Sequence, residues 1–446
     1  MPQPITLQSL QSYKTHFHFD LPYPTKFKQA LDAIAAHGGI SFIVGGVPRD
    51  LVYTALTKIS TVQKDFDVEV YNIPLLQLKE ILSGISSTTL QPKPYPVCKF
   101  FYKKHTEPVD FAIPRVDIQQ DVGHNCNMDV VPNVYMHPCQ AVQRRDLTVN
   151  AAMLHYPSGI IYDFSRRFIH DITNRIADCV SPTNFSDDLL RCYRVAQISA
   201  RLDLTIAQRL YTIAYDKRKY AKLMTPARTV QEILKLVFKG RNIATGLTYL
   251  VETQWIDAIN IGSHGPLVDV KYWKENHIIH HISSMTRIAD ANQVSAEIRG
   301  YMVLAMMSYN IPNPMSAYMG IQFSKHDAMT VQNIITSIHA LRNATSSYDV
   351  RKVAAKSVIN IPLLITLIQP FIPQSEYTKL RYLQQNTNTT NTTPLLIGRD
   401  LVPRYMRGGP LVGQILREAY DLQLHEALTT KQQAIEWAIK QYHLST

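Results

Sequence analysis

Two aspartates separated by one residue are the first feature of this sequence that could do chemistry. Asp65 and Asp67 alternate with Phe66 and Val68, so on a strand both carboxylates would lie on one face. Like charges placed together usually need a cation between them, and Mg²⁺ prefers oxygen ligands that it shares with substrate phosphates. Asp110, in a second apolar run, is a candidate third carboxylate. The pattern predicts phosphoryl or nucleotidyl transfer with two Mg²⁺ ions.

A pair of glycines lies shortly before these aspartates. Gly45 and Gly46 follow an apolar run that predicts a short buried strand, and Pro48 is typical of the first position of a helix. A turn that opens onto a helix N-terminus offers backbone N–H groups and a positive dipole end to an anion. Arg49 could add a guanidinium to the same site. Taken alone, a glycine turn or an alternating aspartate pair also fits a purely structural or solvated role.

Two further segments combine arginine with aspartate. The segment "QRRDLTVNAAM" contains Arg144, Arg145, Asp146 and Asn150, a composition that by itself also fits a solvated helix start.

In "SDDLLRCYR", Asp188 and Arg191 are three residues apart and would share one face of a helix, with Asp187 four residues from Arg191. One interpretation is a surface ion pair of little energetic value. The other is a carboxylate and a guanidinium that read the Watson–Crick edges of C or A.

The composition of the chain indicates the kind of protein and partner to which these motifs belong. The chain has 446 residues, 46% hydrophobic and 18% charged, and a formal net charge of +11, which favours a polyanionic partner, nucleic acid before membrane. Five scattered cysteines without a C-x-x-C pair favour a reducing compartment. Neither a targeting segment nor a membrane-spanning run nor an obligate protein partner is indicated. We therefore expect a cytoplasmic protein.

The elements that must position the motifs fall into successive blocks. Strand and helix patterns mix up to about residue 155, and helical patterns follow; "TPARTVQEILKLVFKG", for example, has Pro226 near its start and Gly240 just past its end. The polar segment 384–394 reads as a linker. The predicted organisation is an N-terminal extension (1–24), a head (25–155), a helical neck (156–225), a helical body (226–383), the linker (384–394) and a helical tail (395–446). The predicted class is α+β, with a small mixed sheet in the head and an all-helical neck, body and tail.

The order of the motifs resembles a known family. The glycine pair with Arg49, the alternating aspartates, "RRDLTVNA" and the acidic pair before Arg191 resemble the class II tRNA nucleotidyltransferases, the CCA-adding enzymes and bacterial poly(A) polymerases. The likeness runs from about residue 25 to near the C-terminus, and the combination of blocks is specific although no single block is. It implies a polymerase-β-like head that uses CTP and ATP with two Mg²⁺ ions and tRNA as the acceptor.

The resemblance also implies roles for individual residues. Asp65 and Asp67 would bind the metal ions, with Asp110 a less certain third carboxylate. Residues implied to contact the nucleotide are Gly45, Gly46 and Arg49 at the triphosphate, Arg144, Arg145, Asp146 and Asn150 around the nucleotide and ribose, and Asp188, Arg191 and Arg194 near the base. Asp188 and Arg191 would act as a protein template for the incoming base.

The sequence departs from the family pattern in three places. Asp187 stands where the family usually has Glu, and Arg167 replaces an expected glycine in a block thought to give head and neck some hinge freedom. In the body, Ser308-Tyr309 stands where related phosphohydrolase domains have a His-Asp metal pair. We therefore expect no metal-dependent hydrolase there, and we expect His277, His280 and His281 to be ordinary helix residues.

Full CCA addition is the leading hypothesis. A poly(A) polymerase, an enzyme adding only CC or only A, and a non-catalytic RNA-binding relative remain alternatives. All of these could share the same fold, and the first two could share the same active site.

Overall fold

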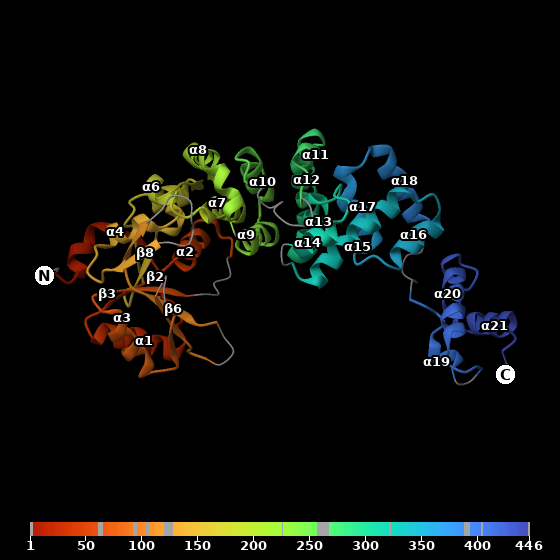
Figure 1. The fold of residues 1–446 in the computed structure, drawn as a ribbon, viewed down its shortest axis with the longest axis horizontal. Helices are drawn as coiled ribbons and strands as arrows, with labels where there is room; N and C mark the ends of the chain where they lie inside the picture. Colours follow the sequence, from red (N-terminus) through yellow and green to blue (C-terminus); the bar gives the residue numbers. More distant parts are fainter. Residues whose placement is uncertain are drawn as a thin grey trace. The chain divides into compact units, whose positions relative to one another are not determined.

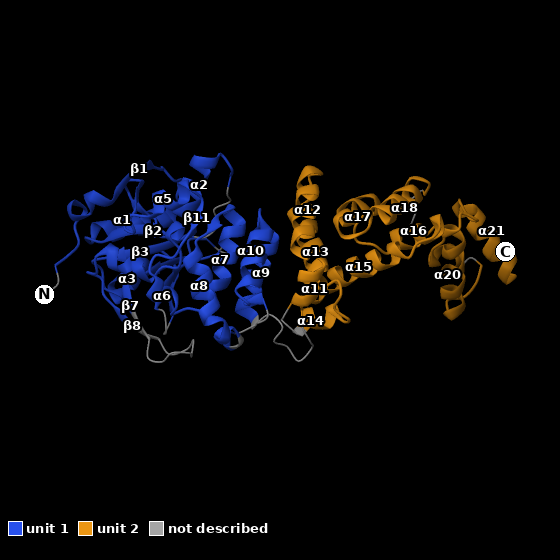
Figure 2. Ribbon diagram, turned by 90° about the horizontal axis from the view of Figure 1, so that it is seen from above, with its two compact units in different colours: residues 1–261 blue, residues 262–446 orange. Residues whose placement is uncertain are grey.

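The computed structural model describes residues 3–60, 66–91, 96–103, 107–119, 128–224, 226–256, 267–320, 323–387, 393–402 and 405–444. They form two compact units, residues 1–261 and 262–446, coloured separately in Figure 2. The first unit contains the predicted head and neck together with the first part of the predicted body. Each unit is described by itself below.

A mixed sheet of eight strands organises the described part of the first unit (Figure 1). In spatial order the strands are β1 (Lys14–His18), β10 (Ile160–Tyr162), β9 (Met153–Tyr156), β2 (Ile40–Val44), β3 (Asp67–Tyr71), β6 (Val109–Ala112), β5 (Val97–Phe100) and β4 (Thr88–Gln91). Only β3 and β6 pair in parallel; the other neighbours are antiparallel. Because β1 and β10 belong to this sheet, it extends beyond the predicted head boundaries of 25 and 155. A separate antiparallel pair is formed by β7 (Arg115–Gln119) and β8 (Met128–Pro132).

Helices cover the sheet through apolar stripes. Helix α1 (Thr25–Ala36) buries Phe27, Ala30, Leu31 and Ile34, the spacing of one helix face, and packs against β2 and against α3 (Leu75–Ser83). Helix α2 (Gly46–Thr57) follows β2 directly and carries the glycine turn. Short helical segments α4 (Pro138–Ala141), η2 (Val142–Arg144) and η3 (Thr148–Asn150) bring the RRD segment to the sheet.

The neck is centred on helix α7 (Leu190–Leu202), which packs against α9 (Pro226–Lys239) and α10 (Ile243–Glu252). A Cβ atom at Gly246 of α10 would lie 2.7 Å from the carbonyl oxygen of Ala196, so only glycine allows α10 to approach α7 this closely. The remaining elements are α5 (Phe168–Thr173), β11 (Ile176–Ala177), α6 (Pro182–Phe185), β12 (Thr205–Ile206), α8 (Gln208–Lys217) and η4 (Arg218–Leu223). Strands β11 and β12 pair in parallel, and β10 of the eight-stranded sheet also lies within residues 156–225, so the prediction of an all-helical neck was wrong at these three short strands.

The described part of the second unit is helical. Its α-helices are α11 (Val270–Glu275), α12 (Ile278–Ala291), α13 (Ala296–Met307), α14 (Pro314–Gly320), α15 (Lys325–Arg342), α16 (Ser347–Ala354), α17 (Ile361–Ile368), α18 (Gln374–Gln385), α19 (Gly398–Leu401), α20 (Pro410–Leu424) and α21 (Lys431–Tyr442). The tail helices share their own apolar core, and the Tyr348 hydroxyl joins α16 to α20 by donating to Asp421 over 2.6 Å. The helix predicted between Pro226 and Gly240 is confirmed as α9, and the tail predicted over 395–446 contains α19, α20 and α21. Residues 388–392 of the predicted linker lie outside the described residues.

Candidate functional site

The glycine turn lies against one of the predicted metal-binding aspartates. Gly45 has φ 76°, the left-handed region that favours glycine, and α2 begins at Gly46. A Cβ atom at Gly45 would lie 3.2 Å from Oδ2 of Asp67, and Val44, which precedes the turn, pairs with Asp67 across the strands, so the turn lies beside this carboxylate. Pro48 is the third helical residue rather than the first, because the helix starts two residues earlier than predicted.

Strand pairing places the described carboxylates side by side. In the parallel pair of β3 and β6, Asp67 lies opposite Asp110, and on the next strand Lys99 lies opposite Asp110. Nζ of Lys99 is 3.2 Å from Oδ1 of Asp110, a partner that the sequence analysis missed. Asp65 lies outside the described residues, so its predicted position beside Asp67 stays a prediction. The two described carboxylates are hard oxygen donors of the kind that suits Mg²⁺.

A buried glutamate links the RRD segment to strand β3. Oε2 of Glu69 is 2.5 Å from Nη2 of Arg144 and 3.3 Å from Nη2 of Arg145. The Tyr71 hydroxyl donates to Oε1 of Glu69 over 2.6 Å. Burial raises the pKa of Glu69, but the two guanidinium groups outweigh burial, and the net pKa lies below the usual range. Sequence reasoning missed Glu69, although its place two residues after Asp67 in an alternating strand put it on the same face.

Asp146 connects the same segment to the neck. Its Oδ2 accepts from Nε of Arg194 on α7 over 2.7 Å, and its Oδ1 accepts from the Asn150 amide over 3.0 Å. Burial raises the pKa of Asp146, but Arg194 and the hydrogen bonds lower it by more than burial raises it, so the carboxyl stays ionised. The predicted residues Asp146, Asn150 and Arg194 are therefore brought together.

Arg49 belongs to the same buried network. Its Nη1 donates to Oδ1 of Asn150 over 2.7 Å, and its Nε donates to Oδ1 of Asp50 over 2.7 Å. Asp50 in turn accepts from Nη2 of Arg201 on α7 over 2.8 Å. The Arg49 side chain is only 7% exposed, so in this structure it ties α2 to η3; its predicted contact with the triphosphate stays a prediction.

The predicted base-reading pair is arranged differently from the expectation. Helix α7 begins at Leu190, so Asp188 precedes the helix, and its Oδ1 accepts from the backbone N–H of Leu190 over 3.0 Å. The guanidinium of Arg191 donates to the carbonyl oxygen of Asn184, and its Nη2 donates to that of Arg144 over 2.5 Å. The prediction that Asp188 and Arg191 share a helix was therefore wrong, but Arg191 does contact the RRD segment.

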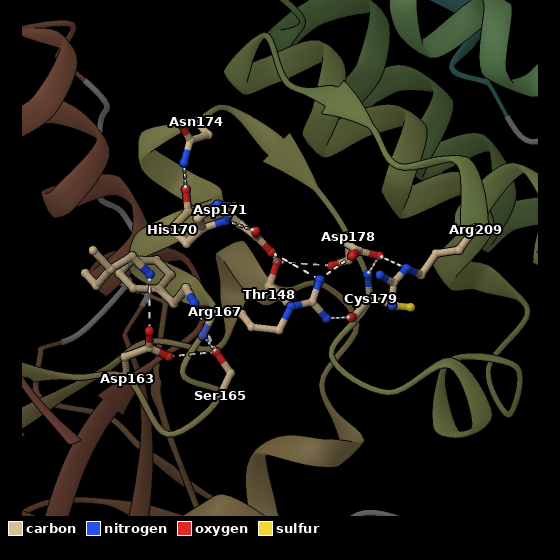
Figure 3. Close-up of polar contacts among 12 residues, drawn as sticks. Thr148, Asp163, Ser165, Arg167, His170, Asp171, Asn174, Asp178, Cys179 and Arg209 are labelled. Carbon is tan, nitrogen blue, oxygen red and sulfur yellow. Dashed lines mark hydrogen bonds and ion pairs between the residues drawn. The ribbon is translucent and has the colours of Figure 1, made fainter. Parts of the chain in front are cut away.

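Arg167, which stands where a glycine was expected, lies in the polar cluster of Figure 3. Its guanidinium pairs with Asp178 and donates to the carbonyl oxygen of Cys179 over 3.1 Å, while Nε of Arg209 approaches Asp178 from α8 at 3.1 Å. Arg167 has φ −129°, which any residue adopts, whereas the left-handed backbone belongs to Arg166 with φ 56°. The conformation that suits glycine is thus one position earlier than the sequence suggested.

The histidine-rich segment of the second unit lies at the start of helix α12. His277 precedes α12, and the rings of His280 and His281 on α12 are 5.9 Å apart. Tyr309, at the expected metal-pair position, stacks on His339 with ring centroids 4.5 Å apart and accepts from Arg342 over 3.2 Å. No group of three His, Cys, Asp or Glu side chains that could hold a metal occurs within the described ranges of either unit. Likewise, no helix within those ranges has the length and apolar character needed to cross a membrane.

Comparison with known proteins gives a consistent likeness. Residues 41–177 match the family model described as Poly A polymerase head domain. A CC-adding tRNA nucleotidyltransferase of Synechocystis sp. is 20% identical over 370 residues, which span 75% of this chain and 80% of that protein.

Solved structures agree on the fold. The Thermotoga maritima CCA-adding enzyme complexed with tRNA has a TM-score of 0.63 at 15% identity, covering 99% of this chain and 100% of that one. The Bacillus stearothermophilus CCA-adding enzyme in complex with CTP has a TM-score of 0.63 at 16% identity, covering 95% and 98%. At these identities the likeness shows the fold alone, and it extends over nearly the whole length of both chains.

Proposed function

Because this chain is a member of the CCA-adding enzyme and poly(A) polymerase family, we propose that it is a tRNA nucleotidyltransferase that adds CCA from CTP and ATP. The observation that carries the proposal is the position of Asp67, which lies next to the glycine turn and opposite Asp110, on the strand that the RRD segment contacts. An anion-binding turn, oxygen donors and paired arginines are the parts that nucleotidyl transfer requires. The net charge of +11 supports a polyanionic acceptor, and we also infer a cytoplasmic location.

In the proposed reaction, the tRNA 3′-oxygen forms a bond to the α-phosphorus while the bond to pyrophosphate breaks, and the hydroxyl proton is lost to solvent. Asp65 and Asp67 would hold Mg²⁺, which supplies charge stabilisation to the transferring phosphate. Gly45 and Gly46 would hold the triphosphate, and Arg144, Arg145 and Asp146 would orient the nucleotide. Asp188 and Arg191 would face the base. The chain thus contributes mainly position and electrostatic stabilisation.

One assay tests this proposal. Purified protein and Mg²⁺ are incubated with tRNA that lacks its CCA end, with CTP and ATP supplied separately and together. Termination after three added nucleotides supports CCA addition, and a long A tail would instead indicate a poly(A) polymerase. Binding of tRNA without incorporation would indicate a non-catalytic relative. An Asp67→Asn variant that retained full incorporation would contradict the proposed metal site.

A second candidate is an enzyme that adds only CC, because the curated relative is a CC-adding enzyme. The same assay separates it: two nucleotides are added from CTP, and ATP extends the product no further. A tRNA that already ends in CC provides the control, since a CCA-adding enzyme would complete it with ATP alone.

A further inference from the structure

The carboxylate of Glu69 occupies an unusual position for a charged group. The residue is 1% exposed, and one of its oxygens, Oε2, faces the Nη2 atoms of Arg144 and Arg145 at 2.5 and 3.3 Å. The other oxygen is occupied by the Tyr71 hydroxyl at 2.6 Å. Burying a carboxylate is unfavourable unless it is paired and hydrogen-bonded, and this one is fully satisfied.

Two guanidinium groups share this one carboxylate. Arg144 and Arg145 both pair with Glu69, and the carboxylate of Asp146 is a further neighbouring charge that acts on Arg145. Nε of Arg145 is buried and has no hydrogen-bond partner among the described residues. Two adjacent guanidinium groups and the unsatisfied Nε donor of Arg145, beside the strand that carries Asp67, suit an anionic ligand.

Glu69 also lies at the junction of the three segments of the candidate site. It is two residues from Asp67 on the same strand, so both side chains lie on one face. Arg144 binds Glu69 through its side chain, and its carbonyl oxygen accepts from Nη2 of Arg191 over 2.5 Å. The aspartate strand and the RRD segment are thus connected through the Glu69 carboxylate, and the backbone of Arg144 extends this connection to α7.

We propose that Glu69 is a positioning residue for nucleotide binding: it holds the Arg144 and Arg145 guanidinium groups beside Asp67, where they bind the phosphates of CTP or ATP. Glu69 itself does not touch the nucleotide. The inference rests on the proposed function, since it assigns the ligand of the RRD arginines to the substrate of that reaction. Without the carboxylate, the two cations repel each other, and the contact that holds the guanidinium groups of Arg144 and Arg145 together is lost.

The test compares Glu69→Gln with Tyr71→Phe, which removes the hydrogen bond to the other oxygen and leaves both arginines paired. In steady-state assays with saturating tRNA, Glu69→Gln is expected to raise KM for CTP about tenfold, equal to ~1.4 kcal/mol, with kcat changed far less. Tyr71→Phe is expected to keep KM within about twofold of the wild type. An unchanged KM in a folded Glu69→Gln variant would overturn the proposal.

A double-mutant cycle with Arg144→Ala identifies the route of the effect. If Glu69 acts through Arg144, KM in the double variant rises by less than the product of the two single effects. Full multiplication of the two effects would contradict the proposal. Should Glu69→Gln fail to fold, Glu69→Asp keeps the charge but withdraws it by one methylene. A raised KM at a wild-type unfolding temperature then supports the proposal, and an unchanged KM overturns it.

The same variants separate this inference from the proposed function. If the wild-type protein incorporates neither CMP nor AMP into tRNA, the proposed function fails. The role of Glu69 is then read from calorimetric titration of the full-length wild type and variants with CTP and Mg²⁺. Weaker CTP binding by Glu69→Gln than by Tyr71→Phe supports the positioning role, and equal binding overturns it.

Discussion

Nε of Arg194 lies 2.7 Å from Oδ2 of Asp146, and this ion pair joins helix α7 of the neck to the RRD segment of the head. Seven residues further along α7, Arg201 pairs with Asp50 at 2.8 Å. Residues seven apart lie on the same helix face, so both arginines reach the head from one side of α7. The neck therefore contacts the head through ion pairs between residues that are far apart in the sequence, which local sequence patterns do not predict.

Replacing Arg194 with Met should destabilise the first unit. The change leaves the carboxylate of Asp146, whose side chain is 9% exposed, without its cation. Breaking a buried pair is strongly destabilising, but 37% of the Arg194 side chain is exposed, so we expect a loss of about 2 kcal/mol. Urea unfolding measures the loss, and the double variant with Asp146→Asn should recover part of it. No recovery would mean that the pair is not the source of the effect.

Stability should fall with acid in a way that depends on Asp146. The pKa of Asp146 is lowered in the folded protein: burial raises it, but the Arg194 pair and hydrogen bonds outweigh burial. A lowered folded pKa contributes stability above the unfolded pKa of about 4, and that contribution is lost as pH falls towards the folded value. The difference in unfolding free energy between wild type and Asp146→Asn should therefore be constant from pH 7 to about 5 and shrink below about 4. A difference independent of pH would contradict this account.

Gly45→Ala should damage the glycine turn. A side chain at φ 76° is strained by about 1–2 kcal/mol, and its Cβ would press on Oδ2 of Asp67 at 3.2 Å. We expect lower thermal stability and at least a tenfold loss of nucleotide incorporation, equal to ~1.4 kcal/mol.

Gly46→Ala is the matched control for stability. Gly46 begins α2, and a Cβ there would meet Nη2 of Arg49 at 3.4 Å, which needs only a small shift of a side chain. Its unfolding temperature should therefore lie closer to that of the wild type. Equal destabilisation by both substitutions would argue against a special conformation at Gly45.

Placing a glycine at position 167, where the family pattern has one, should not increase the stability of the protein. Arg167→Gly removes the ion pair with Asp178 and the hydrogen bond to Cys179, so we expect a loss of about 2 kcal/mol, moderated because Arg209 still pairs with Asp178. Arg166→Gly relieves a left-handed backbone but removes the Arg166 contact with the Tyr13 ring at 4.8 Å, and these effects should nearly cancel. Thermal unfolding of the two variants distinguishes them, and equal stabilities would refute the assignment of roles.

Local patterns were enough to predict the strand, glycine turn and helix of residues 40–57, because apolar runs and glycine act within a few residues of themselves. They also predicted that Asp110 comes close to Asp67, since both lie in short apolar strands. The partners Lys99, Glu69 and Arg201 were missed because a charge within a strand or helix gives no sign of what faces it in the fold. The start of α7 after Asp188 was missed for a similar reason: Asp188 satisfies a backbone N–H before the helix begins.

Helix α7 is fixed to the head at two points along its length. Ion pairs one heptad apart, about 10 Å along the axis, resist both rolling and sliding, because either motion would have to open both pairs at once. On the other side of α7, α10 packs so closely that a Cβ atom at Gly246 would clash with the backbone of α7. The two ion pairs and this close helix packing therefore hold Arg191 and the glycine turn at Gly45 in fixed positions. If Arg191 faces the base and Gly45 holds the triphosphate, as proposed, the distance between these two binding points would stay constant while a nucleotide is bound.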